Sequence, residues 1–207
     1  MTHTTVVLWD WDNTLVDTKN AVKRAVNDVV EKYRLPQVDD DQIRGIMGTY
    51  RGSYWQAFGS QMEEALRFYL DRYAVYSSDV SPFDTAECVL RFLKEKNIPQ
   101  FVISNKRRDL LTAEVNRIGW GHFFNGIQGT GVDHDSKPNK SFADSALKGI
   151  LYDHLLMIGD GESDMHFARN IGATAVLVHN TENKDQWPYD IVCNDLREVL
   201  AVLKTYF

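Results

Sequence analysis

Two aspartates near the start of the chain indicate chemistry on an anionic substrate. Asp10 and Asp12 follow the apolar run of residues 5–9, which is typical of a buried strand, and Thr14 comes two residues later. Two carboxylates this close together repel each other unless a cation lies between them. Mg2+ is a hard cation that prefers oxygen ligands and would meet this need. The segment therefore predicts a metal-assisted reaction at the end of the first strand.

A second acidic segment has the same form further along the chain. The apolar run of residues 154–158 is followed by a glycine, then Asp160, and four residues later Asp164. We expect Asp160 to lie at the same edge of a sheet as Asp10 and to complete an oxygen-rich Mg2+ site, with Asp164 in support. The alternative is that Asp160 and Asp164 only cap the helix that begins near Ser163.

Two further segments supply a hydroxyl group and positive charge. Ser104 ends an apolar run, and its hydroxyl, with the backbone beyond it at Asn105, can hold phosphate oxygens. Lys137 lies in a loop before a proline and can neutralise charge on a transferring phosphoryl group. Taken singly, Ser104 is a common turn residue and Lys137 a common surface residue, and Lys140 is an alternative for the role of Lys137.

A short basic run directly follows Ser104 and Asn105. It consists of Lys106, Arg107 and Arg108. We expect it to be the solvated start of a helix, and the alternative is a contact with the substrate.

Strand-like and helix-like segments alternate along most of the chain. This order predicts an α/β fold with a Rossmann-like, doubly wound parallel sheet that binds its ligand at the carboxyl ends of the strands. Asp84 begins a capping pattern for one helix, and others are predicted at 109–118, 141–150, 163–171 and 195–203. The strand-like runs are residues 5–9, 99–104, 126–129, 154–158, 173–178 and 190–193.

The alternation is interrupted after the first strand by a long stretch with helical periodicity. It predicts a helical cap domain of residues 17–80, inserted into a core of residues 1–16 and 81–207. We expect the cap to present Arg44 and Arg51 to a second anionic group of the substrate. The alternative is that both arginines are surface residues.

The composition limits the classes of protein that the chain can represent. Its 207 residues are 43% hydrophobic and carry a formal net charge of -6, which suits a globular protein and disfavours binding to nucleic acid or an anionic membrane. No apolar run approaches membrane-spanning length, and no basic region precedes a long apolar stretch at the start, so we expect a cytoplasmic protein. Cys88 and Cys193 are expected to be buried free thiols.

Four of these segments together resemble the motifs of the haloacid dehalogenase-like phosphohydrolase superfamily. The resemblance covers nearly the whole core, and the helical insertion after the first motif is similar to the class with a helical cap, which includes phosphoglycolate phosphatases. The matching motifs are, in chain order, Asp10-Trp-Asp12-Asn-Thr14, Ser104, Lys137 and Gly159-Asp160-Gly-Glu-Ser-Asp164.

The resemblance implies a two-step hydrolysis of a small phosphorylated metabolite. Asp10 would be the nucleophile that forms an aspartyl-phosphate, and Asp12 would act first as an acid and then as a base. Mg2+ would be held by Asp10, Asp160 and the backbone carbonyl of Asp12, with Asp164 in support. Thr14 would orient the loop. The phosphoryl oxygens would be bound by Ser104 and Lys137.

Other activities on the same scaffold stay open at this point. A dehalogenase is disfavoured because displacement of a halide from carbon needs no acid at Asp12. A phosphosugar mutase needs the same acid/base and the same phosphoenzyme, and a nucleotide phosphatase would differ only in its substrate. A non-catalytic phosphate-binding protein is disfavoured because all the reactive groups are present. The sequence leaves the substrate and the oligomeric state undetermined.

Overall fold

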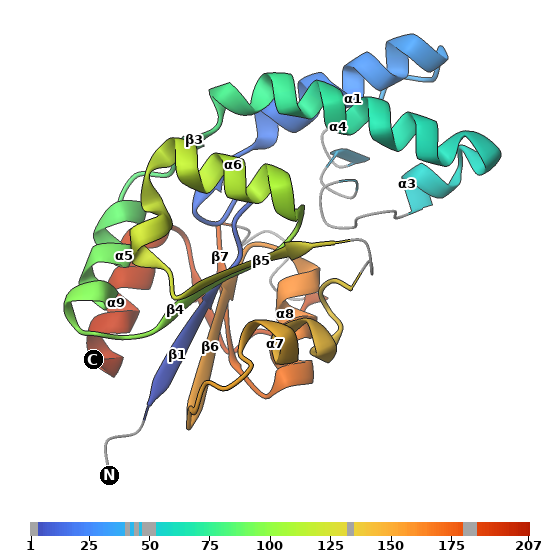
Figure 1. Cartoon of the computed structure of the whole chain (residues 1–207). Helices are drawn as coiled ribbons and strands as arrows, with labels where there is room; N and C mark the ends of the chain where they lie inside the picture. Colours follow the sequence, from blue (N-terminus) through green and yellow to red (C-terminus); the bar gives the residue numbers. More distant parts are fainter. Residues whose placement is uncertain (1–3, 40–41, 44–45, 47–52, 132–134, 180–185) are drawn as a thin grey trace. The chain divides into compact units, whose positions relative to one another are not determined.

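The computed structural model contains a six-stranded parallel sheet between layers of helices, which confirms the predicted fold class (Figure 1). It describes residues 4–39, 42–43, 46, 53–131, 135–179 and 186–207. The chain divides into two compact units. The first comprises Met1–Val16 with Pro82–Phe207, and the second comprises Asp17–Ser81. That the second unit acts as a cap stays a prediction.

The sheet of the first unit has β1 (Thr5–Trp9) near its middle. Its strand order is β5-β4-β1-β6-β7-β8, and all neighbouring strands are parallel. The chain adds strands first on one side of β1 and then on the other, so the order reverses there, and such a reversal is where doubly wound sheets bind ligands. The remaining strands are β4 (Gln100–Arg107), β5 (Gly126–Thr130), β6 (His154–Gly159), β7 (Thr174–Val178) and β8 (Ile191–Cys193).

Helices cover both faces of this sheet. On one face α5 (Ala86–Glu95) contacts α9 (Leu196–Tyr206), and on the other α7 (Lys140–Ala146) contacts α8 (Glu162–Ile171) (Figure 1). The helix α6 (Arg108–Ile118) packs on β4 and β5 and is followed by the short 3-10 helix η3 (Trp120–Phe123). Among the residues with an assigned structure, no helix is both long and apolar enough to cross a membrane.

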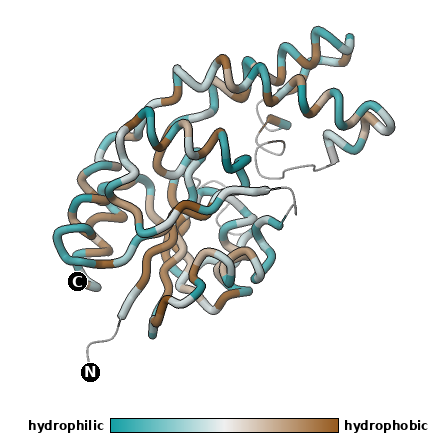
Figure 2. Tube along the Cα trace, viewed as in Figure 1, coloured by the Kyte–Doolittle hydropathy of each residue, from teal (hydrophilic) through white to brown (hydrophobic). Residues whose placement is uncertain are grey.

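Alternate strand residues point to opposite helix layers, as the pleat of a strand requires. Val6 and Leu8 of β1 belong to one buried cluster with Leu177 of β7, Phe142 of α7 and Phe167 of α8. Figure 2 shows this as a concentration of hydrophobic residues along the strands. Burial of both faces explains why the strands read as continuous apolar runs in the sequence.

On the other face of the sheet, beside α5, a buried polar contact links two strands to that helix. The indole Nε1 of Trp9 donates to Gln100 Oε1 at 3.1 Å, and Gln100 Nε2 donates to the carbonyl of Leu90 at 3.0 Å. Each polar atom is paired, so the contact avoids the penalty of an unsatisfied buried group. It joins β1, β4 and α5 on the face that does not contain the large apolar cluster.

The second unit is built on two long helices that pack against each other, α1 (Lys19–Tyr33) and α4 (Met62–Tyr76). Its shorter elements are α3 (Ser53–Gln56), η1 (Gly59–Gln61) and η2 (Ser77–Asp79). The two-residue strands β2 (Val16–Asp17) and β3 (Ser81–Pro82) pair where the chain passes between the units. Arg44 and Arg51 lie outside the described residues, so their predicted role stays a prediction.

Several local predictions about the first unit are wrong. The helix predicted for 141–150 ends at Ala146, because the chain then turns through Gly149 at φ +81°. Asp84 does not begin α5, because Thr85 precedes the helix at φ +71° and no side-chain bond caps it. Cys88 is exposed rather than buried, since the buried stripe of α5 lies on its other face; Cys193 is buried as expected.

The large apolar cluster should carry much of the stability of the first unit. Leu177 is 0% exposed within it, whereas Leu151 is 89% exposed. We expect Leu177→Ala to lower the free energy of unfolding by about 2–5 kcal/mol, because it removes buried methyl groups and leaves a cavity. The matched variant Leu151→Ala should change it by less than about 0.5 kcal/mol. Urea denaturation of both variants tests this, and equal effects would contradict it.

Candidate active site

The candidate nucleophile lies in a tight turn that directly follows β1. The backbone N–H of Asp10 donates to the carbonyl of Ile158 at 2.9 Å, which holds it against β6. The carbonyl of Trp11 accepts backbone bonds from Leu15 at 3.1 Å and Val16 at 3.3 Å, so the chain reverses at once. Asn13 takes the left-handed conformation at φ +56°, which asparagine tolerates better than most residues.

Three carboxylates from two distant segments meet at this point. Asp10, Asp160 and Asp164 each place a carboxylate oxygen within 4.8 Å of the others. Asp10 and Asp164 are buried and Asp160 is partly buried. The hydroxyl of Thr14 lies 3.3 Å from Asp10 Oδ2 and 3.4 Å from Asp160 Oδ1, so its single hydrogen can bond to either. The two acidic segments thus converge on one site at the carboxyl ends of β1 and β6.

Lys137 places its ammonium group inside this carboxylate cluster. Its Nζ lies 2.5 Å from both Asp10 Oδ1 and Asp164 Oδ1, and the side chain is buried. The side-chain amide of Asn105 binds the backbone of Lys137. It accepts a hydrogen bond from Lys137 N at 2.8 Å and donates one to Lys137 O at 3.3 Å. Lys140, the alternative, is exposed at the start of α7.

Gly159 is required for the approach of Asp164 to this cluster. A Cβ atom at position 159 would lie 2.4 Å from Asp164 Cγ, far inside van der Waals contact. Asp164 also accepts the backbone N–H of Gly161 at 3.0 Å through Oδ2, which caps the start of α8. Asp164 therefore caps the helix through Oδ2 while its Oδ1 contacts Lys137, and its support of Mg2+ stays a prediction.

The electrostatics of the cluster show an excess of negative charge. Burial, reinforced by the charges of Asp164 and Asp12 and opposed by Lys137, raises the pKa of Asp10 to about 7. Burial and the neighbouring charges of Asp10 and Asp164 also hold the pKa of Asp160 well above its usual range. Burial alone would lower the pKa of Lys137, but the two carboxylates it contacts outweigh burial and raise it. One ammonium group does not balance the carboxylates.

These residues fit a hard divalent cation. The donors are carboxylate oxygens from Asp10, Asp160 and Asp164, the ligand type that Mg2+ prefers, and they are close enough together to share one ion. A second positive charge would also offset the repulsion that raises the pKa values of Asp10 and Asp160.

Ser104 and Asn105 lie beside the cluster, within β4 rather than at its end. The strand continues to Arg107, and its pairing with β5 shifts between Ile103 and Arg107. Ser104 is buried, and its Oγ accepts the backbone N–H of Lys106 at 3.2 Å. Their contact with a substrate phosphate stays a prediction.

Lys106 is not the solvated residue that the sequence led us to expect. Its Nζ donates to Asp12 Oδ1 at 2.6 Å and to Glu114 Oε2 at 2.7 Å, and only 6% of the side chain is exposed. Glu114 Oε2 also accepts the indole N–H of Trp11 at 2.8 Å. The reason is that β4 runs past Ser104, so Lys106 projects from a strand and not from the first turn of a helix.

Glu114 was not identified from the sequence, although its position among apolar residues of a helix is unusual for a carboxylate. It lies in α6 among the buried residues Leu110, Leu111 and Val115. A carboxylate on the buried stripe of a helix needs a cationic partner. That pattern could have indicated a buried lysine nearby, but it does not say which one.

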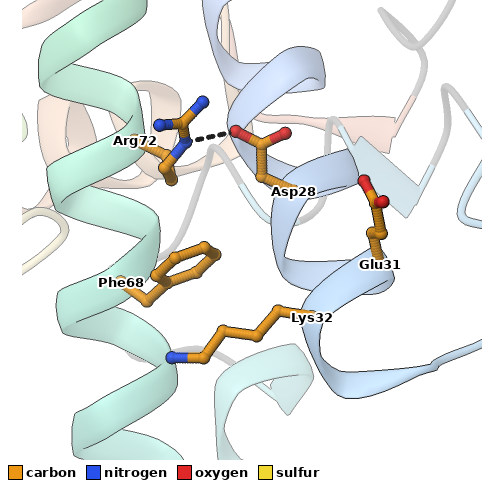
Figure 3. Close-up of a pocket in the computed structure, with 5 residues that line it drawn as sticks. All are labelled: Asp28, Glu31, Lys32, Phe68 and Arg72. Atoms are coloured by element: carbon orange, nitrogen blue, oxygen red, sulfur yellow. Dashed lines mark hydrogen bonds and ion pairs between the residues drawn. The ribbon is translucent and has the colours of Figure 1, made fainter.

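A shallow pocket in the second unit contains none of the predicted site residues. It has a volume of about 340 Å3 and lies between α1 and α4 (Figure 3). Arg72 Nε donates to Asp28 Oδ2 at 2.5 Å across it, and the ammonium of Lys32 lies 4.2 Å from the ring centre of Phe68. Arg72 and Asp28 thus pair with each other, while Lys32 bonds to Glu64.

Removal of the Lys137 ammonium should destabilise the protein strongly. Lys137→Met would leave Asp10 and Asp164 buried without their cation, so we expect the free energy of unfolding to fall by about 3–5 kcal/mol. The matched control Lys140→Met removes an exposed lysine and should change it by less than about 0.5 kcal/mol. Urea denaturation without divalent cations is the measurement, and similar midpoints for the two variants would refute the prediction.

Comparison with known proteins places this geometry in a family. Residues 7–178 match the haloacid dehalogenase-like hydrolases. The chain is 25% identical to a phosphoglycolate phosphatase from Chromobacterium violaceum, over 98% of this chain and 97% of that one. It is 27% identical to an N-acetylmuramic acid 6-phosphate phosphatase from Pseudomonas aeruginosa, over 95% and 93% of the two chains.

Among solved structures, the fold is similar to that of a haloacid dehalogenase-like hydrolase from Streptococcus pneumoniae. The TM-score is 0.86 at 23% identity, over 98% of this chain and 100% of that one. The match of residues 7–178 includes both acidic segments that form the carboxylate cluster. The chain therefore belongs to the family of haloacid dehalogenase-like hydrolases.

Proposed function

We propose that this protein is a Mg2+-dependent phosphatase that hydrolyses a small phosphomonoester through an aspartyl-phosphate on Asp10. The observation that carries the proposal is the position of Asp10, buried at the end of β1 in contact with Lys137 and within a cluster of carboxylates suited to a divalent cation. The names of the relatives from Chromobacterium violaceum and Pseudomonas aeruginosa, both phosphatases of small phosphorylated compounds, support the same reaction class.

In the first step Asp10 displaces the alcohol of the ester. A carboxylate oxygen of Asp10 forms a bond to phosphorus, the bond from phosphorus to the ester oxygen breaks, and Asp12 gives its proton to the departing alkoxide. Lys137, already in contact with Asp10, lies where it can attract the phosphoryl oxygens. Ser104 is proposed to donate to another of these oxygens.

In the second step water releases the phosphate. Asp12 takes a proton from the water, the water oxygen bonds to phosphorus, and the bond from phosphorus to the Asp10 oxygen breaks. Asp12 is thereby protonated again and Asp10 is returned as a carboxylate. Division of hydrolysis into two displacements lets one carboxylate serve as acid and then as base.

Mg2+ would be held by the side chains of Asp10 and Asp160 and the backbone carbonyl of Asp12, with Asp164 in support. When bound, it supplies positive charge that keeps Asp10 ionised and reduces its repulsion of an anionic ester. The second unit is proposed to be the cap that selects the substrate. Its Arg44 and Arg51 would bind a further anionic group such as the carboxylate of phosphoglycolate.

The Asp10 side chain provides the direct test of the reaction. Wild type should release inorganic phosphate in the presence of Mg2+ from at least one ester in a panel of 2-phosphoglycolate, N-acetylmuramic acid 6-phosphate, sugar phosphates and nucleoside monophosphates. Asp10→Asn should lose more than about 10³-fold in kcat, because the amide cannot act as the nucleophile. Release of phosphate is followed colorimetrically, and products are identified by phosphorus NMR.

The matched control is Asp144→Asn, which changes an exposed aspartate of α7 and should retain full activity. Absence of phosphate release by pure wild type on every ester would favour a phosphate-binding protein instead. A rearranged sugar phosphate in place of free phosphate would identify a mutase.

The proposed metal requirement predicts a reversible response to chelation. EDTA should abolish phosphate release, and added Mg2+ should restore it. Mg2+ should also stabilise the wild type against urea, because a ligand that binds only the folded state shifts the unfolding equilibrium by mass action. Asp160→Asn should weaken that stabilisation, since it removes one of the three carboxylates in the cluster. Activity that persists in EDTA would contradict the metal requirement.

A further inference from the structure

We propose that Lys106, itself held by the buried carboxylate of Glu114, is a positioning residue that fixes the acid/base side chain of Asp12. The inference rests on the proposed function, in which Asp12 transfers the proton. The two residues that it concerns, Lys106 and Glu114, lie outside the cluster of Asp10, Asp160 and Asp164.

The contact that carries this inference is a buried chain of three charged groups. Asp12 Oδ1 bonds to Lys106 Nζ, which also bonds to Glu114 Oε2. The Glu114 side chain is only 2% exposed, and its Oε2 also accepts the indole N–H of Trp11. Burial alone would lower the pKa of Lys106, but the charges of Asp12 and Glu114 raise it, so the ammonium form is retained. Lys106 is thus held at its charged end by a buried carboxylate of α6.

The backbone of Lys106 is held as closely as its ammonium group. A Cβ atom at Gly129 would lie 2.7 Å from both the carbonyl of Lys106 and the Cα of Arg108, so only glycine lets β5 approach here. The backbone N–H of Lys106 donates to Ser104 Oγ at 3.2 Å. With both ends fixed, Lys106 can impose one orientation on the carboxylate that it binds.

That orientation suits a group that must transfer a proton. Lys106 binds one carboxylate oxygen of Asp12, so the other oxygen is the one that can give a proton to the alcohol and later take one from water. The two lysines of the site bind different carboxylates: Lys137 contacts Asp10, the proposed nucleophile, and Lys106 contacts Asp12, the proposed acid and base.

The test compares two leaving groups. An alkyl phosphate needs protonation of its leaving oxygen, whereas 4-nitrophenyl phosphate releases a stabilised anion that needs little. We expect Lys106→Met to lower kcat/KM for the alkyl ester by about 10²-fold, the lower range of what general acid catalysis contributes. For 4-nitrophenyl phosphate the loss in kcat/KM should be less than about fivefold, because its leaving group needs little help from a general acid. Glu114→Ala should give the same selective loss, because Glu114 holds the ammonium group of Lys106.

Two further variants keep the result interpretable. Lys106→Met/Glu114→Gln removes the unpaired buried charge that could unfold the single variant, and it should show the same selectivity. Lys148→Met removes an exposed lysine and should behave as wild type on both esters. Equal losses on the two esters in folded variants would overturn the inference. Failure of the wild type to release phosphate from 4-nitrophenyl phosphate and from every ester of the panel would instead overturn the proposed function, and this inference with it.

Discussion

The concentration of negative charge at the carboxyl ends of β1 and β6 is the constraint on which the rest of the site depends. Asp10, Asp160 and Asp164 each place a carboxylate oxygen within 4.8 Å of the others. Two further carboxylates, those of Asp12 and Glu114, bond to Lys106. Like charges in a medium of low dielectric repel strongly, so such a cluster persists only with cations among its members. Two buried ammonium groups supply part of that charge, and a divalent cation would supply the rest.

The sheet topology determines which residues meet there. Because strands are added first on one side of β1 and later on the other, the end of β1 is bordered by both β4 and β6. Asp10 and Asp160 then follow adjacent parallel strands, and Ser104 lies in the third. The irregular pairing of β4 with β5 beyond Ile103 adds Lys106 to the same edge. The fold thus brings the segments around Asp10, Ser104 and Asp160, which are far apart in the sequence, to one edge of the sheet.

Much of this could be predicted from the sequence, because each element carries a local signal. Apolar runs located the strands, and carboxylates directly after two of them located Asp10 and Asp160. Lys106 was wrongly expected to be solvated and Glu114 was missed, because both take part in a contact between β4 and α6 that no local pattern encodes. The ends of α5 and α7 were misjudged for a related reason: left-handed residues at Thr85 and Gly149 override the helical periodicity.

The separation of charge into two networks has a mechanistic consequence. If a single lysine bound both Asp10 and Asp12, a substrate phosphate that attracted that lysine would disturb the nucleophile and the acid together. Here Lys137 bonds to Asp10 and Asp164, while Lys106 bonds to Asp12 and Glu114. In the proposed mechanism, a phosphoryl group that drew on the charge of Lys137 would therefore leave the contact of Lys106 with Asp12 intact. Burial of the Glu114 carboxylate carries a desolvation cost, and in the proposed mechanism this carboxylate would keep Lys106 and Asp12 independent of the contacts of Lys137.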